Sequence, residues 1–319
     1  MSPASLSVIS DAVSVRVPAK VNLHLGVGPL RADGYHDLVT VYQALSLYDD
    51  VTVAQAATLE VTLRREGGRG ADAAEVPLGD DNLAVRAVRA LGEWADRDPR
   101  VTIEIVKRIP VAGGMAGGSA DAAGALVALA ALWKLDIPRA QLLEIAAGLG
   151  SDVPFSVQGG TALGTGRGEQ LMPMLARGEL HWVLAFAREG LSTPAVFDEL
   201  DRLRADHSET FPEQNPRPDE LMAALAAGRP EQIAPLLHND LQPAALSLQP
   251  GLRRTLRAGI DSGALGGMVS GSGPTCAFLC ADADAAVAVA AELSGAGVAR
   301  SVRTAAGPVG GATRQTPGR

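Results

Sequence analysis

A glycine-rich segment in the middle of the chain restricts the possible folds more than any other part of the sequence. Residues 110–124 read Pro-Val-Ala-Gly-Gly-Met-Ala-Gly-Gly-Ser-Ala-Asp-Ala-Ala-Gly, and residues 125–133 continue with Ala, Leu, Val and Trp. Upstream, residues 101–107 alternate between apolar and polar side chains, as a β-strand does. The sequence therefore predicts a strand, a glycine loop and a helix, in that order.

This junction is a candidate phosphate-binding site. Backbone N–H groups and the positive end of a helix dipole meet there, and glycine lets a phosphate approach without a Cβ in the way. The two commonest phosphate loops do not match, because Ser119 stands where a Walker loop needs lysine and no segment reads Gly-x-Gly-x-x-Gly. A glycine turn that only packs a buried helix against a sheet is the alternative, so other motifs have to decide.

Composition and charge limit the class of protein. A chain of 319 residues with 47% hydrophobic and 20% charged residues is typical of a soluble protein with two domains. A net charge of −8 argues against a nucleic-acid partner. The longest apolar run, residues 122–133, is too short for a membrane span, and the N-terminus lacks a basic segment typical of a signal peptide. Cys276 and Cys280 lack metal-site spacing. We expect a cytoplasmic protein.

Lysine is rare in this chain. Only Lys20, Lys107 and Lys134 are lysines, and all other basic residues are arginine. A lysine in such a chain is a candidate for a task that needs a compact charge. The strand pattern of residues 13–25 places Lys20 on one face with Asn22 and His24. Lys134 is explained by its position near the end of the long helix.

The remaining pattern predicts an α+β fold in two domains that meet near residue 165. Strands are expected at residues 39–41, 51–53, 59–63, 182–186, 268–270, 275–280 and 298–304. Helices are expected at residues 82–95, 119–133, 139–147, 218–227, 230–238, 250–262 and 283–294, with a further helix beginning at Ser192-Thr193-Pro194. Loops are expected at residues 64–80 and 206–218, and residues 306–319 are expected to form a disordered tail.

Three segments together resemble the signature motifs of the GHMP kinases, which phosphorylate small molecules. They are Pro-Ala-Lys-Val-Asn-Leu at residues 18–23, the glycine loop at residues 110–120, and Ser-Gly-Ser-Gly-Pro-Thr-Cys at residues 270–276. Two more segments, Arg-Ala-Asp-Gly-Tyr-His at residues 31–36 and Leu-Gly-Ser-Asp-Val-Pro-Phe at residues 149–155, resemble the branch whose substrate carries a cytidine diphosphate. The resemblance covers residues 13–305.

The resemblance implies a fold and an activity. The fold would combine a ribosomal-protein-like α+β domain (residues 1–165) with a ferredoxin-like domain (residues 166–305), and the active site would lie between them. The activity would transfer the γ-phosphoryl group of ATP, with Mg²⁺, to the 2-hydroxyl of 4-(cytidine 5'-diphospho)-2-C-methyl-D-erythritol in nonmevalonate isoprenoid biosynthesis. The partners would be a small-molecule substrate, no nucleic acid and no membrane, with the chain a monomer or a weak homodimer.

The resemblance also assigns catalytic and ATP-binding residues. Asp152 would accept the proton of the acceptor hydroxyl, and Lys20 would keep Asp152 ionised. Ser119 is expected to cap the helix and to contact phosphate or Mg²⁺. Without the motif, Asp152 would read as a turn carboxylate and Lys20 as a strand lysine with an exposed head group. The ATP-binding residues would be Lys107, Pro110, Val111, Ala112, Gly113, Gly114, Met115, Ala116, Gly117, Gly118, Ser119 and Ala120.

The acceptor-binding residues come from three segments. Tyr35 and His36 match the pair that recognises cytosine, and Asn22 matches a substrate-contacting asparagine. Thr193 is expected near the lysine–aspartate pair and Phe197 near the cytosine, although a helix cap and a core residue explain these two equally well. Two details depart from the family pattern: Ala112 and Ala116 replace frequent glycines, and residues 164–168 (Gly-Thr-Gly-Arg-Gly) are unusually rich in glycine.

Three other functions stay open at this point. Another GHMP kinase, of the homoserine or mevalonate type, would not need the Asp-Gly-Tyr-His element at residues 33–36. A catalytically silent nucleotide or sugar sensor on the same fold would not need the Lys20–Asp152 pair. A ribosome-associated module of similar fold is disfavoured by the charge of −8.

Overall fold

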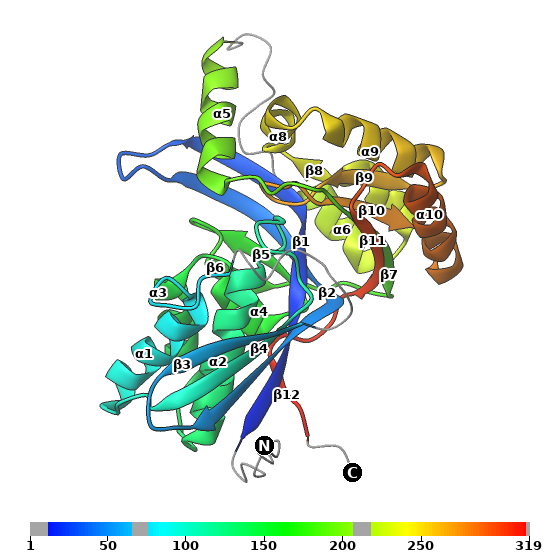
Figure 1. Ribbon diagram of the computed structural model, residues 1–319. Coiled ribbons are helices and arrows are strands. Elements are labelled where there is room, and N and C mark those ends of the chain that lie inside the picture. Colours follow the sequence, from blue (N-terminus) through cyan, green and yellow to red (C-terminus); the bar gives the residue numbers. More distant parts are fainter. Residues whose placement is uncertain (1–11, 66–75, 207–217, 317–319) are drawn as a thin grey trace.

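The protein is built around two β-sheets with helices packed on them (Figure 1). The computed structural model describes residues 12–65, 76–206 and 218–316. Its mixture of helices and sheets confirms the α+β class. Within the described residues, no helix is long and apolar enough to cross a membrane.

Among the described residues, the first sheet has eight strands and is dominated by two long antiparallel ones. β1 (Val13–Leu30) pairs along its length with β2 (His36–Gln55), so two of the short predicted strands belong to one element. The other strands of this sheet are β3 (Glu60–Arg65), β4 (Val101–Lys107), β5 (Thr161–Thr165), β6 (Gln170–Pro173), β8 (His238–Asn239) and β12 (Thr313–Arg314). The path through the sheet runs β12-β1-β2-β4-β3, with β3 parallel to β4.

Helix α2 (Gly117–Leu132) lies at the centre of the first domain. Apart from Ser119 and Asp121 its side chains are apolar and most are buried, and it packs against both β1 and β2. A Cβ at Gly124 would lie 2.7 Å from the Val51 side chain, so this glycine permits close helix–sheet packing. The neighbouring helices are α1 (Leu83–Ala95), α3 (Arg139–Leu149) and α4 (Val153–Gln158).

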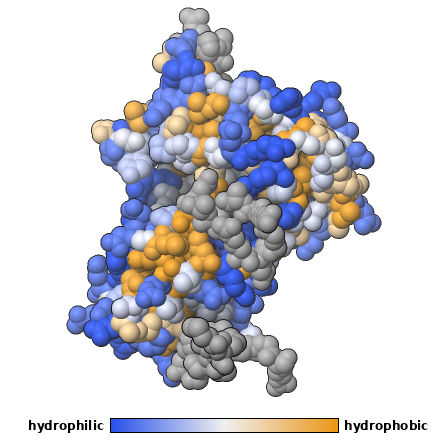
Figure 2. All heavy atoms as spheres, in the orientation of Figure 1, coloured by the Kyte–Doolittle hydropathy of each residue, from blue (hydrophilic) through white to orange (hydrophobic). Residues whose placement is uncertain are grey.

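The second sheet is antiparallel in the order β11-β7-β10-β9, with Trp182 and Phe278 fully buried. Its strands are β7 (Leu180–Phe186), β9 (Gly266–Val269), β10 (Cys276–Cys280) and β11 (Ser301–Gly307). The helices of this half are α5 (Thr193–Asp206), α6 (Asp219–Ala227), α7 (Pro230–Ile233), the 3₁₀ turn η2 (Ala234–Leu236), α8 (Gln242–Leu248), α9 (Gly251–Asp261) and α10 (Ala283–Ala296). Figure 2 shows the two halves joined at a narrower waist.

The tail prediction was wrong for residues 306–316. β12 pairs with β1, and Val309 accepts the backbone N–H of Gly160 and donates its own N–H to the carbonyl oxygen of Ala44 in β2. This attachment uses backbone groups of a glycine-rich segment. The sequence there therefore has no apolar periodicity that would predict a strand. The first sheet also includes β6, β8 and β12, so the chain returns to it beyond the expected boundary at residue 165. Most of the two predicted loops at 64–80 and 206–218 lies outside the described residues.

Candidate active site

The glycine loop joins β4 to α2, as the sequence predicts. The loop ends at Ala116, which stands before α2 in a left-handed conformation (φ 59°) and makes no side-chain cap hydrogen bond. The prediction that Ser119 caps the helix was therefore wrong, because Ser119 lies inside the first turn. The first N–H groups of a helix have no partner within it. With no side-chain cap at Ala116, the start of α2 offers these donors to a phosphate.

A buried ion cluster supports the loop from behind. Lys107 Nζ contacts Asp49 Oδ2 at 2.6 Å, Asp121 Oδ2 at 2.7 Å and the carbonyl oxygen of Gly117 at 2.8 Å. Asp49 Oδ1 also accepts the backbone N–H groups of Arg108 and Ile109. The ammonium hydrogens of Lys107 thus have protein partners, and the cluster fixes the two ends of the loop. Sequence reasoning missed Asp49, whose only local signal is a carboxylate within a β-strand.

The cluster changes the protonation of its members. Burial raises the pKa of Asp121 to about 8, although Lys107 opposes this shift. Burial lowers the pKa of Lys107, but the charges of Asp121 and Asp49 outweigh it and leave that pKa raised. Lys107 therefore keeps its positive charge at neutral pH, while burial favours the protonated form of Asp121.

The third glycine motif closes on the loop from the second domain. Ser270 Oγ donates to the carbonyl oxygen of Gly114 at 3.1 Å. A Cβ at Gly114 (φ 71°) would lie 2.1 Å from the Ser270 carbonyl oxygen, so glycine is required there. Asn239 holds this motif by donating to the carbonyl oxygens of Val269 and Gly271. Asn239 is a second residue that sequence reasoning missed, because its partners are distant in sequence.

Lys20 and Asp152 meet beside this junction. Lys20 Nζ lies 3.8 Å from Asp152 Oδ2 and donates to Asn22 Oδ1 at 2.6 Å. The Lys20 backbone N–H bonds to the carbonyl oxygen of Met115 in the glycine loop, at 3.3 Å. Gly271 (φ 55°) also borders the pair, since a Cβ there would lie 3.1 Å from Lys20 Nζ. The structure thus brings together all three motifs that the sequence analysis identified.

The electrostatics of this pair suit proton transfer. The Lys20 side chain is 6% exposed and Asp152 is 29% exposed. Burial lowers the pKa of Lys20, and the Asp152 carboxylate partly offsets this. A separation of 3.8 Å is too long for a direct hydrogen bond, and a hydroxyl oxygen about 2.8 Å from both groups satisfies both. The arrangement can hold an acceptor alcohol between a cation and a base.

Helix α5 joins this pair to a second group of predicted residues. Thr193 Oγ1 lies 2.9 Å from Ser272 Oγ, next to Gly271. One turn further along, Phe197 stacks on His36 with ring centroids 5.2 Å apart. Thr193 and Phe197 are four residues apart, about 6 Å along a helix axis. The first turn of α5 therefore connects the Lys20–Asp152 pair to the expected cytosine-binding residues.

His36 and Tyr35 lie in different surroundings. His36 is buried, with Nδ1 2.9 Å from the Gly28 carbonyl oxygen and Nε2 3.3 Å from Asp201 Oδ2. Tyr35 is 52% exposed, and the guanidinium carbon of Arg167 lies 5.0 Å from its ring centroid. His24 does not join Lys20 and Asn22: a register shift separates Asn22 from His24, and the His24 ring packs against His238.

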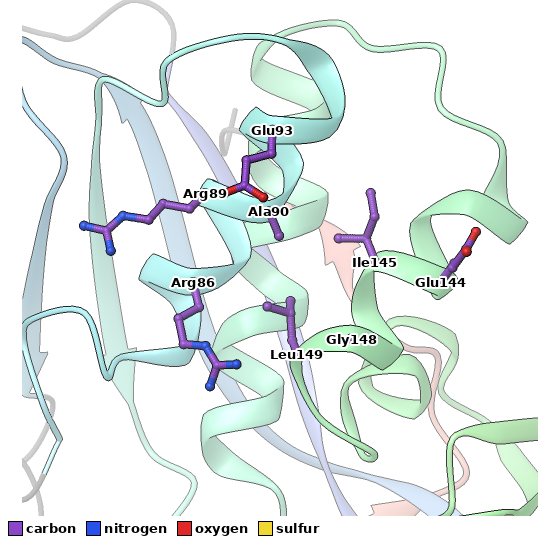
Figure 3. A pocket seen from close by; sticks show the side chains of 8 residues that line it. All are labelled: Arg86, Arg89, Ala90, Glu93, Glu144, Ile145, Gly148 and Leu149. Atoms are coloured by element: carbon purple, nitrogen blue, oxygen red, sulfur yellow. The ribbon is translucent and has the colours of Figure 1, made fainter.

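A surface pocket lies elsewhere in the first domain, between α1 and α3 (Figure 3). Two arginines, two glutamates and four uncharged residues line it, and Arg89 is paired with Asp80 at 2.7 Å. Apart from Leu149, the first residue of the 149–155 segment, none of its lining residues belongs to a motif, so we do not assign the substrates to it. The lining residues are Arg86, Arg89, Ala90, Glu93, Glu144, Ile145, Gly148 and Leu149.

Comparison with known proteins identifies the class to which this fold and site belong. Residues 82–160 match the GHMP kinases N terminal domain, and residues 221–299 match the GHMP kinases C terminal family model. Together with close relatives that cover nearly the whole chain, these matches show that the chain belongs to the GHMP kinases. The chain is therefore a kinase, as the sequence motifs predicted.

The curated relatives narrow the class. The chain is 64% identical to the 4-diphosphocytidyl-2-C-methyl-D-erythritol kinase of Nocardia farcinica over 96% of this chain and 97% of the relative. It is 63% identical to the kinase of the same name from Rhodococcus jostii, over 96% of each chain. The Mycobacterium tuberculosis kinase of that name is 57% identical over 97% of this chain and 95% of the relative.

Solved structures agree with the fold. A crystal structure of 4-(cytidine 5'-diphospho)-2C-methyl-D-erythritol kinase superposes with a TM-score of 0.73 at 32% identity, covering 93% of this chain and all of that one. Homoserine kinase from Cytophaga hutchinsonii superposes with a TM-score of 0.72 at 17% identity, covering 99% of this chain and 100% of that one. At that identity, the second likeness concerns the fold alone.

Proposed function

We propose that this chain transfers the γ-phosphoryl group of ATP to the 2-hydroxyl of 4-(cytidine 5'-diphospho)-2-C-methyl-D-erythritol. The observation that carries the proposal is the Lys20–Asp152 pair next to an uncapped helix start in the glycine loop. The names of relatives 57–64% identical to this chain support the choice of acceptor. We expect the enzyme to work in the cytoplasm, where ATP is available.

Each end of the site has a separate task in this reaction. The glycine loop would bind the phosphates through backbone N–H groups, aided by the dipole of α2. Asp152 would accept the proton of the acceptor hydroxyl. The hydroxyl oxygen would bond to the γ-phosphorus while the bond from that phosphorus to the ADP oxygen breaks. Lys20 would stabilise negative charge on the reacting oxygen, and its compact, buried ammonium group suits that position.

The residues near the loop fit a Mg²⁺ ion bound mainly by the nucleotide phosphates. Ser119 offers a hydroxyl oxygen in the first turn of α2, whereas Asp121 is committed to Lys107. Magnesium prefers oxygen ligands and commonly uses few protein groups together with substrate phosphates. When bound, the ion would neutralise charge on the transferring phosphoryl group.

An ADP-release assay with three acceptors tests the proposal. The purified protein with ATP and Mg²⁺ receives the cytidine-diphospho substrate, mevalonate or homoserine. We expect ADP release to depend on the cytidine-diphospho substrate and free cytidine diphosphate to inhibit it competitively. Activity on mevalonate or homoserine without any response to cytidine nucleotides would reject the proposed acceptor. Failure to turn over any acceptor would instead favour a nucleotide-binding sensor.

A further inference from the structure

Tyr42 contacts the proposed base directly, and none of the motifs includes it. Its hydroxyl donates to Asp152 Oδ1 at 3.0 Å, while Asp152 Oδ2 faces Lys20 Nζ at 3.8 Å. Asp152 stands at the start of α4 but makes no side-chain cap hydrogen bond there. The orientation of this carboxylate therefore depends on Tyr42 and Lys20.

The Tyr42 ring is held on several sides. It is 2% exposed and stacks on Phe155 with ring centroids 4.8 Å apart. Lys20 Nζ lies 5.8 Å from the ring centroid. Burial and the charge of Asp152 raise the pKa of Tyr42 well above its ordinary value, so the hydroxyl remains a donor at neutral pH. A fixed ring with a permanent donor is suited to orienting a carboxylate.

The unexplained glycine segment at residues 164–168 closes over this ring. A Cβ at Gly168 (φ 103°) would lie 2.3 Å from the Tyr42 hydroxyl oxygen, and a Cβ at Gly164 would lie 2.7 Å from ring atom Cε2. The Gly166 carbonyl oxygen accepts the Leu38 N–H, which ties the segment to β2. The same segment carries Arg167 over Tyr35. It therefore contacts both the ring beside the base and an expected cytosine-binding residue.

We propose that Tyr42 is a positioning residue for phosphoryl transfer. Its hydroxyl holds one oxygen of Asp152, so that the other oxygen faces Lys20 and the acceptor hydroxyl. The glycine segment at residues 164–168 keeps the Tyr42 hydroxyl in that position. This inference rests on the proposed function, because it assigns Tyr42 a role only if Asp152 is the base.

The Tyr42→Phe variant tests the first part. It keeps the ring and its stacking but loses the donor, so we expect kcat to fall about tenfold or more with little change in either KM. A lost hydrogen bond to the charged form raises the pKa of a carboxylate, so the acidic limb of the kcat profile should move to higher pH. The charged groups facing this site are Lys20 and, beside Tyr42, Glu169.

Tyr48→Phe is the matched control. Tyr48 lies on the same strand, six residues along, where its ring contacts Arg16 rather than Asp152. We expect this variant to keep the kcat and the pH profile of the parent. A Tyr42→Phe variant that also keeps both would overturn the inference, as would a fall in melting temperature without a shift of the acidic limb.

Gly168→Ala tests the second part. The new methyl group clashes with the Tyr42 hydroxyl oxygen. The ring carbon that carries this hydroxyl, Cζ, is 3.4 Å away, an ordinary contact distance, so a phenylalanine ring leaves room for the methyl group. We therefore expect Gly168→Ala to lower kcat, and Tyr42→Phe combined with Gly168→Ala to be no worse than Tyr42→Phe alone. Gly263→Ala controls for backbone strain, because Gly263 has the same φ of 103° with open space around it. Additive losses in the double variant would overturn the role of the segment.

Asp152→Asn separates failure of this inference from failure of the proposed function. An inactive Asp152→Asn variant beside a fully active Tyr42→Phe variant would reject the positioning role and leave the proposed function intact. A parent protein that releases no ADP with the cytidine-diphospho substrate would reject the proposed function, and the inference with it.

Discussion

In the proposed reaction, the glycine loop binds phosphate through backbone N–H groups, whereas the acceptor end uses side chains from separate segments. The loop, residues 110–116, is continuous in sequence and is held by Lys107 and Ser270. The acceptor end combines Lys20, Asp152 and the first turn of α5, which lie far apart in the chain. The loop should therefore be sensitive to added Cβ atoms, and the acceptor end to altered functional groups.

The largest expected effect comes from the functional group at the acceptor end. Asp152→Asn keeps the size of the side chain but removes its negative charge. We expect kcat to fall by roughly two to four orders of magnitude because the proton acceptor is lost. ATP affinity, measured by calorimetry, should stay close to that of the parent. Near-normal turnover in the variant would exclude Asp152 as the base.

An added Cβ should damage the loop next most strongly. Gly114→Ala puts a methyl group 2.1 Å from the Ser270 carbonyl oxygen, so the loop has to move away from the third motif. We expect the KM for ATP to rise about tenfold or more, with a smaller change in the KM for the acceptor. Gly160→Ala is the control, because Gly160 has φ 72° against 71° at Gly114 but open space around it. Equal kinetic damage in both variants would point to backbone strain alone.

Gly117, one of the expected ATP-binding residues, is a poorer site than Gly114 for testing the loop. Gly117 reads from sequence as a phosphate-facing glycine, but a Cβ there would lie 3.0 Å from Lys107 Nζ and 3.2 Å from the Pro110 carbonyl oxygen. Gly117→Val therefore disturbs the support behind the loop before it disturbs any phosphate. Gly114 is the better test because its Cβ would meet the other motif.

Local patterns predicted much of this fold, and tertiary pairing accounts for what they missed. The strand, glycine loop and helix are local and were confirmed. The attachment of residues 306–316 was missed because it uses backbone hydrogen bonds. Asn239 and Asp49 were missed for a similar reason, since their partners come from other segments. The family motifs found Lys20 and Asp152, but no pattern links either to Tyr42 on another strand.

A smaller effect is expected where the acceptor end is exposed. If Tyr35 stacks on cytosine, Tyr35→Ala should weaken kcat/KM for the cytidine-diphospho substrate by about 1–3 kcal/mol, the usual worth of a base–aromatic stack. The KM for ATP should change little, because the proposed ATP phosphate site is the glycine loop, whereas Tyr35 is exposed beside Arg167. Competition by free cytidine diphosphate should weaken in parallel. An unchanged inhibition constant would show that Tyr35 serves only the turn and its contact with Arg167.

The smallest expected effect returns to the loop and has the opposite sign. Ala112 and Ala116 occupy left-handed conformations, with φ 50° and 59°, where a Cβ costs about 1–2 kcal/mol. Glycine removes that cost but adds entropy to the unfolded chain, which offsets about 0.4–1 kcal/mol. We therefore expect Ala116→Gly to raise the free energy of unfolding by up to about 1 kcal/mol in urea titrations. Ala120→Gly, inside α2, should lower it by about 1 kcal/mol or more, because helical glycine is unfavourable. Equal destabilisation by both substitutions would mean that the left-handed backbone at Ala116 carries no strain that glycine can relieve.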